Sequence, residues 1–99
     1  MSRWFITRHL GALEWAQSQG FVFDKQQGHL HDVRCIQPGD CVFGSLPFNL
    51  AFAVQERGAD YFHLSIEVPE RLRGQELTAA MMSKYNAKFE QFIITRVKY

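Results

Sequence analysis

Two segments of the chain place polar residues between a stretch typical of a β-strand and a stretch typical of a helix. They are FITRHLGALEW, residues 5–15, and VFGSLPFNLAF, residues 42–52. In open α/β sheets, ligands bind beyond the carboxyl ends of the strands, and the helix that follows a strand offers unpaired N–H groups and positive dipole character there. We therefore expect both segments to meet at one edge of a sheet and to form a site for a small anion such as a phosphate.

The side chains that could act in this site lie at the two strand-to-helix joints and toward the end of a third strand. The candidates are Thr7, Arg8, His9, Ser45, Leu46, Pro47, Asn49, His63 and Ser65. The guanidinium of Arg8 can bind a phosphate through two parallel hydrogen bonds. The imidazole of His9 can donate or accept a proton near neutral pH.

Ordinary structural roles also fit several of these residues. Thr7 and Ser45 could cap the two helices, and Arg8 could pair with a carboxylate on the surface. His63 falls inside a strand and could be a hydrogen-bonded residue of the core. The residue types and their spacing therefore predict an anion-binding edge of the sheet, and no specific reaction.

Other kinds of site lack their usual sequence patterns. The chain has no GxGxxG fingerprint after its first strand, which argues against a nicotinamide enzyme. It also has no GxSxG nucleophile elbow and no P-loop. His29 and His31 form an HxH pair, but no third ligand stands nearby, so we expect no metal site and no cofactor. Cys35 and Cys41 lack CxxC spacing and are expected to be free thiols.

Composition and charge are those of a small globular protein. The 99 residues are 46% hydrophobic and 21% charged, which suits a single domain, residues 1–99, with one core. Eleven basic residues against ten acidic ones give a net charge of +1, which argues against binding of long nucleic acid. The chain has no apolar run of transmembrane length and no signal peptide pattern near its first residues. We therefore expect a cytoplasmic protein that does not enter a membrane.

Strand and helix patterns alternate along the chain. Strands are predicted at residues 3–8, near 29–33, and at 41–45, 60–68 and 88–97, and helices at 11–19, from Pro47 to Gly58, and at 79–85. Such alternation implies crossover connections and a mostly parallel sheet. The predicted architecture is a compact Rossmann-like three-layer α/β fold.

Three longer phrases resemble a small family of type III CRISPR accessory proteins. They are TRH-x-GA-x-EW, QPGD-x-V-x-G-x-LP-x-NLA and RGA-x-Y-x-HLS, and the resemblance runs over about residues 4–96. It implies a relation to the CARF-type sensor domains that bind cyclic oligoadenylates, and a homodimer. It also implies a metal-independent ring nuclease that cleaves cyclic tetra-adenylate and so switches off antiviral signalling.

The implied reaction assigns roles to the candidate residues. A ribose 2′-hydroxyl attacks the adjacent phosphorus and expels the 5′-oxygen, with Arg8 and His9 as catalytic residues and the other candidates as ligand-binding residues. On this interpretation Arg8→Ala has a strong effect, His29→Ala has little, and the loop of residues 69–77 with Arg71 and Arg73 could close over the ligand. The alternatives are a protein that sequesters the cyclic oligoadenylate without cleaving it, and a structural subunit that binds a CRISPR effector through exposed apolar surface.

Overall fold

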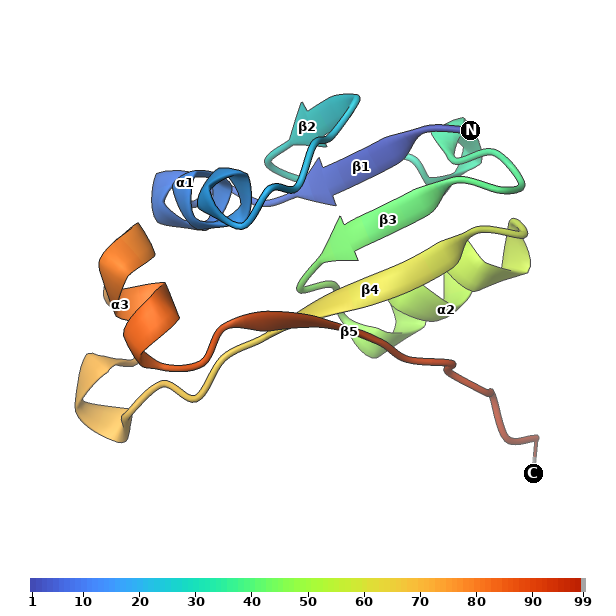
Figure 1. Cartoon of the computed structure of the whole chain (residues 1–99). Coiled ribbons are helices and arrows are strands. Elements are labelled where there is room, and N and C mark those ends of the chain that lie inside the picture. The colour runs from blue at the N-terminus through green and yellow to red at the C-terminus, as the bar shows by residue number, and fades with distance from the viewer. Residues whose placement is uncertain (99) are drawn as a thin grey trace.

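The sheet has five strands in the order β2-β1-β3-β4-β5 (Figure 1). The computed structural model describes residues 1–98. The strands are β1 (Arg3–Ile6), β2 (Lys25–Gln27), β3 (Cys41–Gly44), β4 (Asp60–Ser65) and β5 (Lys88–Gln91). The first four are mutually parallel, and β5 runs antiparallel to β4. The predicted α/β class with a mostly parallel sheet is therefore confirmed.

Three helices cover the two faces of this sheet. They are α1 (Leu10–Ser18), α2 (Phe48–Glu56) and α3 (Ala79–Lys84), with short 3₁₀ turns η1 (Val33–Cys35) and η2 (Glu70–Leu72) in the connections. On one face α1 and α3 pack over a core that contains Phe5 and Phe43, and on the other face α2 packs over a core that contains Trp4 and Val42. Successive side chains of a strand point to opposite faces. Trp4 and Phe5 of β1 therefore enter different cores, and so do Val42 and Phe43 of β3. Within residues 1–98 no helix has the length and apolarity that crossing a membrane requires.

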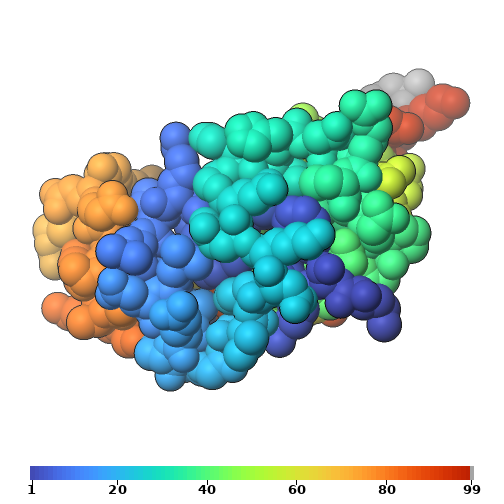
Figure 2. Space-filling model, turned by 90° about the horizontal axis from the view of Figure 1, so that it is seen from above, coloured from blue at the N-terminus to red at the C-terminus, as the bar shows by residue number. Residues whose placement is uncertain are grey.

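The predicted strand near residues 29–33 is wrong. The edge strand β2 lies earlier, at Lys25–Gln27, and the residues after it form a loop that leads into η1. The sequence KQQ has no apolar alternation because this strand pairs only with β1 and leaves most of its side chains exposed. In Figure 2 the cyan segment that contains β2 and the following loop covers much of β1, which is dark blue.

The last predicted strand is too long. β5 ends at Gln91, where its pairing with Phe62 of β4 also ends. The chain then leaves the sheet and runs along α2, where the side-chain amide of Gln55 accepts a hydrogen bond from Ile94 N and donates one to Ile94 O. These contacts replace the ladder, so residues 92–97 do not continue the strand. The predicted strands at 3–8, 41–45 and 60–68 are likewise shorter in the structure, at Arg3–Ile6, Cys41–Gly44 and Asp60–Ser65.

A buried carboxylate fastens the amino ends of the central strands. Asp40, which precedes β3, accepts hydrogen bonds from Ser2 N (2.7 Å), Gln37 N (3.0 Å) and Trp4 Nε1 (3.1 Å). Burial raises the pKa of Asp40, but the three hydrogen bonds and the positive charge of the amino terminus together outweigh burial and hold the pKa below the usual value of 3.8. The Asp40 carboxylate therefore has a structural role at the amino ends of the strands, away from the candidate site at their carboxyl ends.

Candidate functional site

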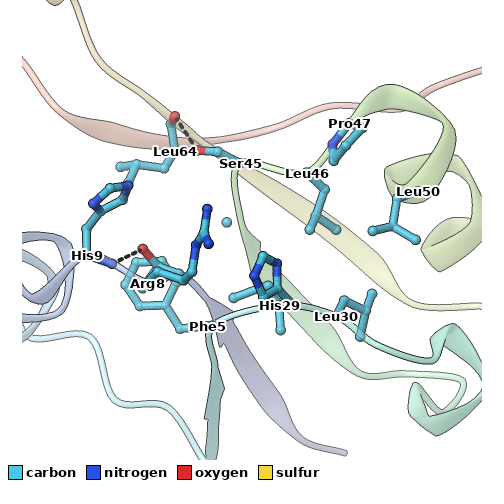
Figure 3. A pocket seen from close by; sticks show the side chains of 14 residues that line it. Phe5, Arg8, His9, His29, Leu30, Ser45, Leu46, Pro47, Leu50 and Leu64 are labelled. Carbon is cyan, nitrogen blue, oxygen red and sulfur yellow. Dashed lines mark hydrogen bonds between the residues drawn. The ribbon is translucent and has the colours of Figure 1, made fainter. Parts of the chain in front are cut away.

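A cavity of about 400 Å³ lies at the carboxyl ends of β1 and β3 (Figure 3). From β1 the chain moves outward to β2 and then returns to β3 on the other side of β1, so the direction of winding reverses between β1 and β3. A reversal of this kind opens a crevice where α/β proteins bind ligands. The cavity wall combines both strand-to-helix joints with residues 28–30 of the loop after β2. The predicted meeting of the two joints is therefore confirmed.

Thr7 shapes the first joint from within. It is buried, its N–H donates to Gln27 O (2.8 Å), and its carbonyl accepts from the side-chain amide of Gln26 (2.7 Å). Its hydroxyl accepts a hydrogen bond from His9 N (3.2 Å). The N-cap of α1 is His9, whose side chain makes no capping hydrogen bond, so Thr7 organises the turn instead of capping the helix.

Arg8 is exposed, and its guanidinium points into the cavity (Figure 3). Its aliphatic stem lies against Gly28, where a Cβ would come within 2.9 Å of Arg8 Cγ. No carboxylate within residues 1–98 pairs with Arg8, and none is part of the cavity wall. A guanidinium that has no anionic partner and lies in a cavity without carboxylates is suited to binding an anion from solution.

His9 is held by a carboxylate from a distant part of the chain. Its Nδ1 lies 2.9 Å from Oε1 of Glu76, and the two side chains are 63% and 70% exposed. Glu76 comes close because Gly11, in the first turn of α1, has no side chain to collide with the carbonyl of Leu77. A carboxylate only accepts hydrogen bonds, so Nδ1 carries the proton in this pair and Nε2 is left to act on a ligand.

The second joint is held by a buried tyrosine hydroxyl. Tyr61 Oη accepts a hydrogen bond from Leu46 N (2.8 Å) and lies 3.1 Å from Gly44 O and 2.7 Å from His63 Nδ1. Burial raises the pKa of Tyr61 above 10.0, and the hydrogen bond from Leu46 N opposes this only in part. Tyr61 therefore stays neutral near pH 7 and fixes the loop that carries the second half of the cavity wall.

The remaining residues of the second joint differ in their position. Ser45, Leu46 and Pro47 line the cavity, and the hydroxyl of Ser45 donates to Leu64 O (3.4 Å). The N-cap of α2 is Pro47, so Ser45 does not cap this helix. Both helices that start at the cavity thus begin without a side-chain cap, which leaves their first N–H groups for solvent or a ligand.

Three predicted ligand-binding residues lie outside the cavity. Asn49 is in the first turn of α2 but lines a separate groove with Phe52 and Arg96. His63 is half-buried and bonded to Tyr61, which agrees with the structural interpretation of this residue. Ser65 is half-buried in β4, where it pairs with β5. The sequence did not predict that these three side chains lie outside the cavity, because their positions depend on how α2 and β5 pack.

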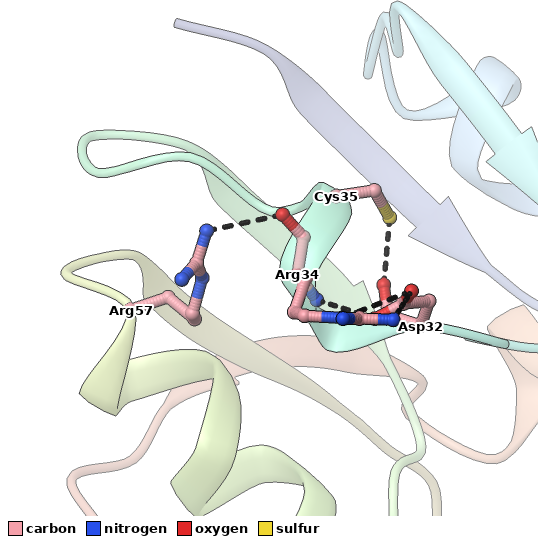
Figure 4. A network of polar contacts seen from close by, with 4 residues as sticks. All are labelled: Asp32, Arg34, Cys35 and Arg57. Carbon is pink, nitrogen blue, oxygen red and sulfur yellow. Dashed lines mark hydrogen bonds and ion pairs between the residues drawn. The ribbon is translucent and has the colours of Figure 1, made fainter.

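The loop after β2 brings a residue that was not among the candidates. His29 is exposed and lines the cavity beside Arg8, and Leu30 is buried under the loop. The loop continues into η1, where Arg34 and Asp32 form an ion pair and the carbonyl of Arg34 accepts from Nη2 of Arg57 (3.0 Å) (Figure 4). These contacts fix the loop to the end of α2. The sequence did not predict the place of His29 at the cavity, because no local pattern indicates an edge strand made of polar residues.

The two histidines of the HxH pair lie near each other without a third possible metal ligand from residues 1–98 beside them. The rings of His29 and His31 are 5.8 Å apart, and no group of three possible ligands gathers anywhere in residues 1–98. Cys35 is exposed and Cys41 is half-buried, and both are free thiols, as predicted. Arg71 and Arg73 of the loop at residues 69–77 are exposed and do not line the cavity. Glu76 of this loop contacts His9 of the site.

A second, smaller cavity of about 190 Å³ adjoins the first. The two share His9, Ser45 and Leu64 as a common wall. The rest of its lining is apolar apart from one amide side chain, and consists of Ala12, Ile66, Gln75, Leu77 and Met82. A cationic cavity next to a mostly apolar one offers complementary surroundings for the phosphate and the base of a nucleotide.

A family model matches most of the chain. The family described as "Putative CRISPR-associated protein (Cas_VVA1548)" matches residues 4–95. Neither the curated proteins nor the solved structures include a match to this chain. The matched range contains both joints, the loop with His29, and Glu76, so the whole candidate site lies in the part of the chain that the family defines.

Proposed function

The chain belongs to the Cas_VVA1548 family of putative CRISPR-associated proteins, and from this premise we propose that it is a ring nuclease. Its substrate in this proposal is cyclic oligoadenylate, with cyclic tetra-adenylate as the first choice, and its role is to end type III CRISPR antiviral signalling. The fold proposed is the Rossmann-like fold of CARF-type domains, which the strand order β2-β1-β3-β4 and the helices on both faces support.

One observation carries this proposal. Arg8, without a carboxylate partner in residues 1–98, enters the cavity where two uncapped helices begin, and the smaller apolar cavity adjoins it. The first cavity suits a phosphate and the second suits a nucleobase. The low net charge of +1 favours a small nucleotide ligand over long nucleic acid.

The proposed reaction is a transesterification within the ring. Arg8 holds the phosphate and neutralises the charge that develops on its oxygens, while the N–H groups at the starts of α1 and α2 add donors. The adjacent ribose 2′-hydroxyl attacks phosphorus in line with the 5′-oxygen, which departs. The products carry a 2′,3′-cyclic phosphate and a 5′-hydroxyl. Removal of the proton from the 2′-hydroxyl is assigned to Nε2 of His9, which Glu76 orients through Nδ1.

The size of the substrate supports a homodimer. A cavity of about 400 Å³ suits one ligand of drug size, which is smaller than a ring of four nucleotides. A ring with two-fold symmetry can be shared by two identical chains around one axis. We therefore include two chains per ring in the proposal, each supplying one cavity.

The test compares two exposed arginines. Purified wild type, Arg8→Ala and Arg71→Ala are incubated with labelled cyclic tetra-adenylate in EDTA, and both bound ligand and linear product are measured. Loss of one charged donor at the reacting phosphate is expected to lower the rate of Arg8→Ala by about 10²–10³-fold. Arg71→Ala removes an equivalent charge away from both cavities and should behave as wild type. Equal effects of the two substitutions would contradict the placement of the site, and tight binding without product would leave a sequestering protein.

A further inference from the structure

A reaction at phosphorus needs two proton transfers, and the cavity contains two imidazoles. His9 and His29 both line it, from different segments of the chain. We propose that His29 is the second proton-transfer residue of the reaction, the general acid that protonates the leaving 5′-oxygen. This inference rests on the proposed ring nuclease function, and it reverses the expectation that His29 has little effect.

The position of His29 follows from the packing of Arg8. His9 is the next residue after Arg8, and Gly28, the residue before His29, lies against the stem of Arg8. In the projection of Figure 3 the guanidinium lies between the two imidazole rings, and all three side chains line the same cavity. A phosphate bound to Arg8 would therefore lie in a cavity that both imidazoles line. In-line displacement has its attacking and leaving oxygens on opposite sides of phosphorus, and we place one imidazole at each of them.

The loop that carries His29 is anchored at both ends. Before it, Gln27 O accepts a hydrogen bond from Thr7 N (2.8 Å), so the end of β2 is tied to the first joint. Immediately after His29, the side chain of Leu30 is buried in the core. A residue between two such anchors has little freedom to leave the cavity, which is what a proton donor needs in order to meet its acceptor.

The partners of the two imidazoles assign their roles. The Glu76 carboxylate beside Nδ1 of His9 stabilises the positive charge that this ring acquires when it accepts a proton, so His9 is the base. His29 faces the cationic Arg8 and has the ring of His31 at 5.8 Å, and it acts as the acid. Within residues 1–98, no carboxylate lines the cavity wall around His29.

The step balances without a further reactant. The 2′-hydroxyl gives its proton to Nε2 of His9, the 2′-oxygen forms a bond to phosphorus, and the bond from phosphorus to the 5′-oxygen breaks. Protonated His29 gives its proton to that oxygen. His9 ends as imidazolium and His29 as neutral imidazole, and exchange with water restores both.

The experiment uses His29→Ala with His31→Ala as its matched control, because His31 is an exposed neighbouring imidazole that does not line the cavity. Binding and single-turnover cleavage of cyclic tetra-adenylate are measured from pH 5 to 9. A second substrate has sulfur in place of the 5′-bridging oxygen, because a thiolate leaves without a proton. We expect His29→Ala to bind normally, to cleave the normal ring about 10²-fold more slowly, and to lose the alkaline limb of the pH profile.

The sulfur substrate separates an acid from a residue that only shapes the cavity. His29→Ala should cleave it at nearly the wild-type rate, whereas a shaping role would leave both substrates equally slow and would overturn the inference. An unchanged rate with the normal ring, or an equal loss in His31→Ala, would also overturn it. If wild type cleaves neither substrate, the ring nuclease proposal itself fails; if wild type cleaves and only the His29 result is negative, that proposal stands and this inference falls.

Discussion

Replacement of Tyr61 by Phe tests how the cavity wall is held, because it removes a single oxygen atom from a buried ring. The loss leaves Leu46 N, a buried donor now bonded at 2.8 Å, without its acceptor, and it also removes the hydroxyl from Gly44 O and His63 Nδ1. An unsatisfied buried donor costs about 1–3 kcal/mol. We therefore expect the free energy of unfolding to fall by about 2 kcal/mol, since the aromatic packing is kept.

The matched control is Tyr85→Phe. Tyr85 is half-buried beside Lys84, and its hydroxyl has no hydrogen-bond partner within residues 1–98. In thermal unfolding, a loss of about 2 kcal/mol in a domain of this size lowers the midpoint by roughly 8–16 °C. Tyr85→Phe should change it by much less. Equal shifts for the two variants, or no shift for Tyr61→Phe, would refute the assignment of Tyr61 as the residue that holds the second joint.

The same variant has an effect on pH dependence with a defined sign. Burial raises the pKa of Tyr61 in the folded state above its usual 10.0, so the contribution of this group is fully present below pH 10 and is lost as the pH rises through the folded-state pKa. Wild type should therefore lose stability above pH 10 more steeply than Tyr61→Phe. Urea titrations at pH 8 and at pH 10.5 measure this difference, and parallel losses in the two proteins would contradict it.

Three further predictions concern other groups. Asp40→Ala should lower the free energy of unfolding by about 3 kcal/mol in urea titrations, because buried donors lose their acceptor. Since the pKa of Asp40 is lowered in the folded state, its contribution to stability is present above pH 3.8 and is lost as the pH falls through the lower folded-state value. An acid profile of stability that is equally flat in wild type and variant would contradict this. Glu76→Gln should slow cleavage about tenfold with binding unchanged, whereas Glu70→Gln, on the exposed η2 turn, should match wild type in the same single-turnover assay. Gly28→Val should push the stem of Arg8 aside and weaken binding of cyclic tetra-adenylate about tenfold in calorimetry, and wild-type affinity would show that this contact does not position Arg8.

The sequence predicted the parts of the fold that local patterns determine. Apolar and β-forming residues marked β1, β3 and β4, and the polar residues after β1 and β3 marked the two joints that the structure brings together at one cavity. Parallel strands place their carboxyl ends at a common edge, so finding two strand-to-helix joints was enough to predict their proximity.

The missed parts depend on contacts between distant residues. β2 is a short polar strand whose only strong determinant is its pairing with β1, so its position and that of His29 could not be inferred from apolar periodicity. The partner of His9, Glu76, is 67 residues away and arrives through packing against Gly11. Asn49 has suitable chemistry and position in the sequence, but the orientation of α2 directs it into another groove.

The most direct test of the central claim is the identity of the product formed by the wild-type protein. Cyclic tetra-adenylate is incubated with the protein in excess EDTA, and the reaction is resolved by chromatography and mass spectrometry. We predict linear oligoadenylates with a 2′,3′-cyclic phosphate and a 5′-hydroxyl, which are the products of attack by the 2′-hydroxyl at the phosphate held by Arg8. Recovery of the intact ring, without binding at micromolar protein, would contradict both the ring nuclease and the sequestering protein.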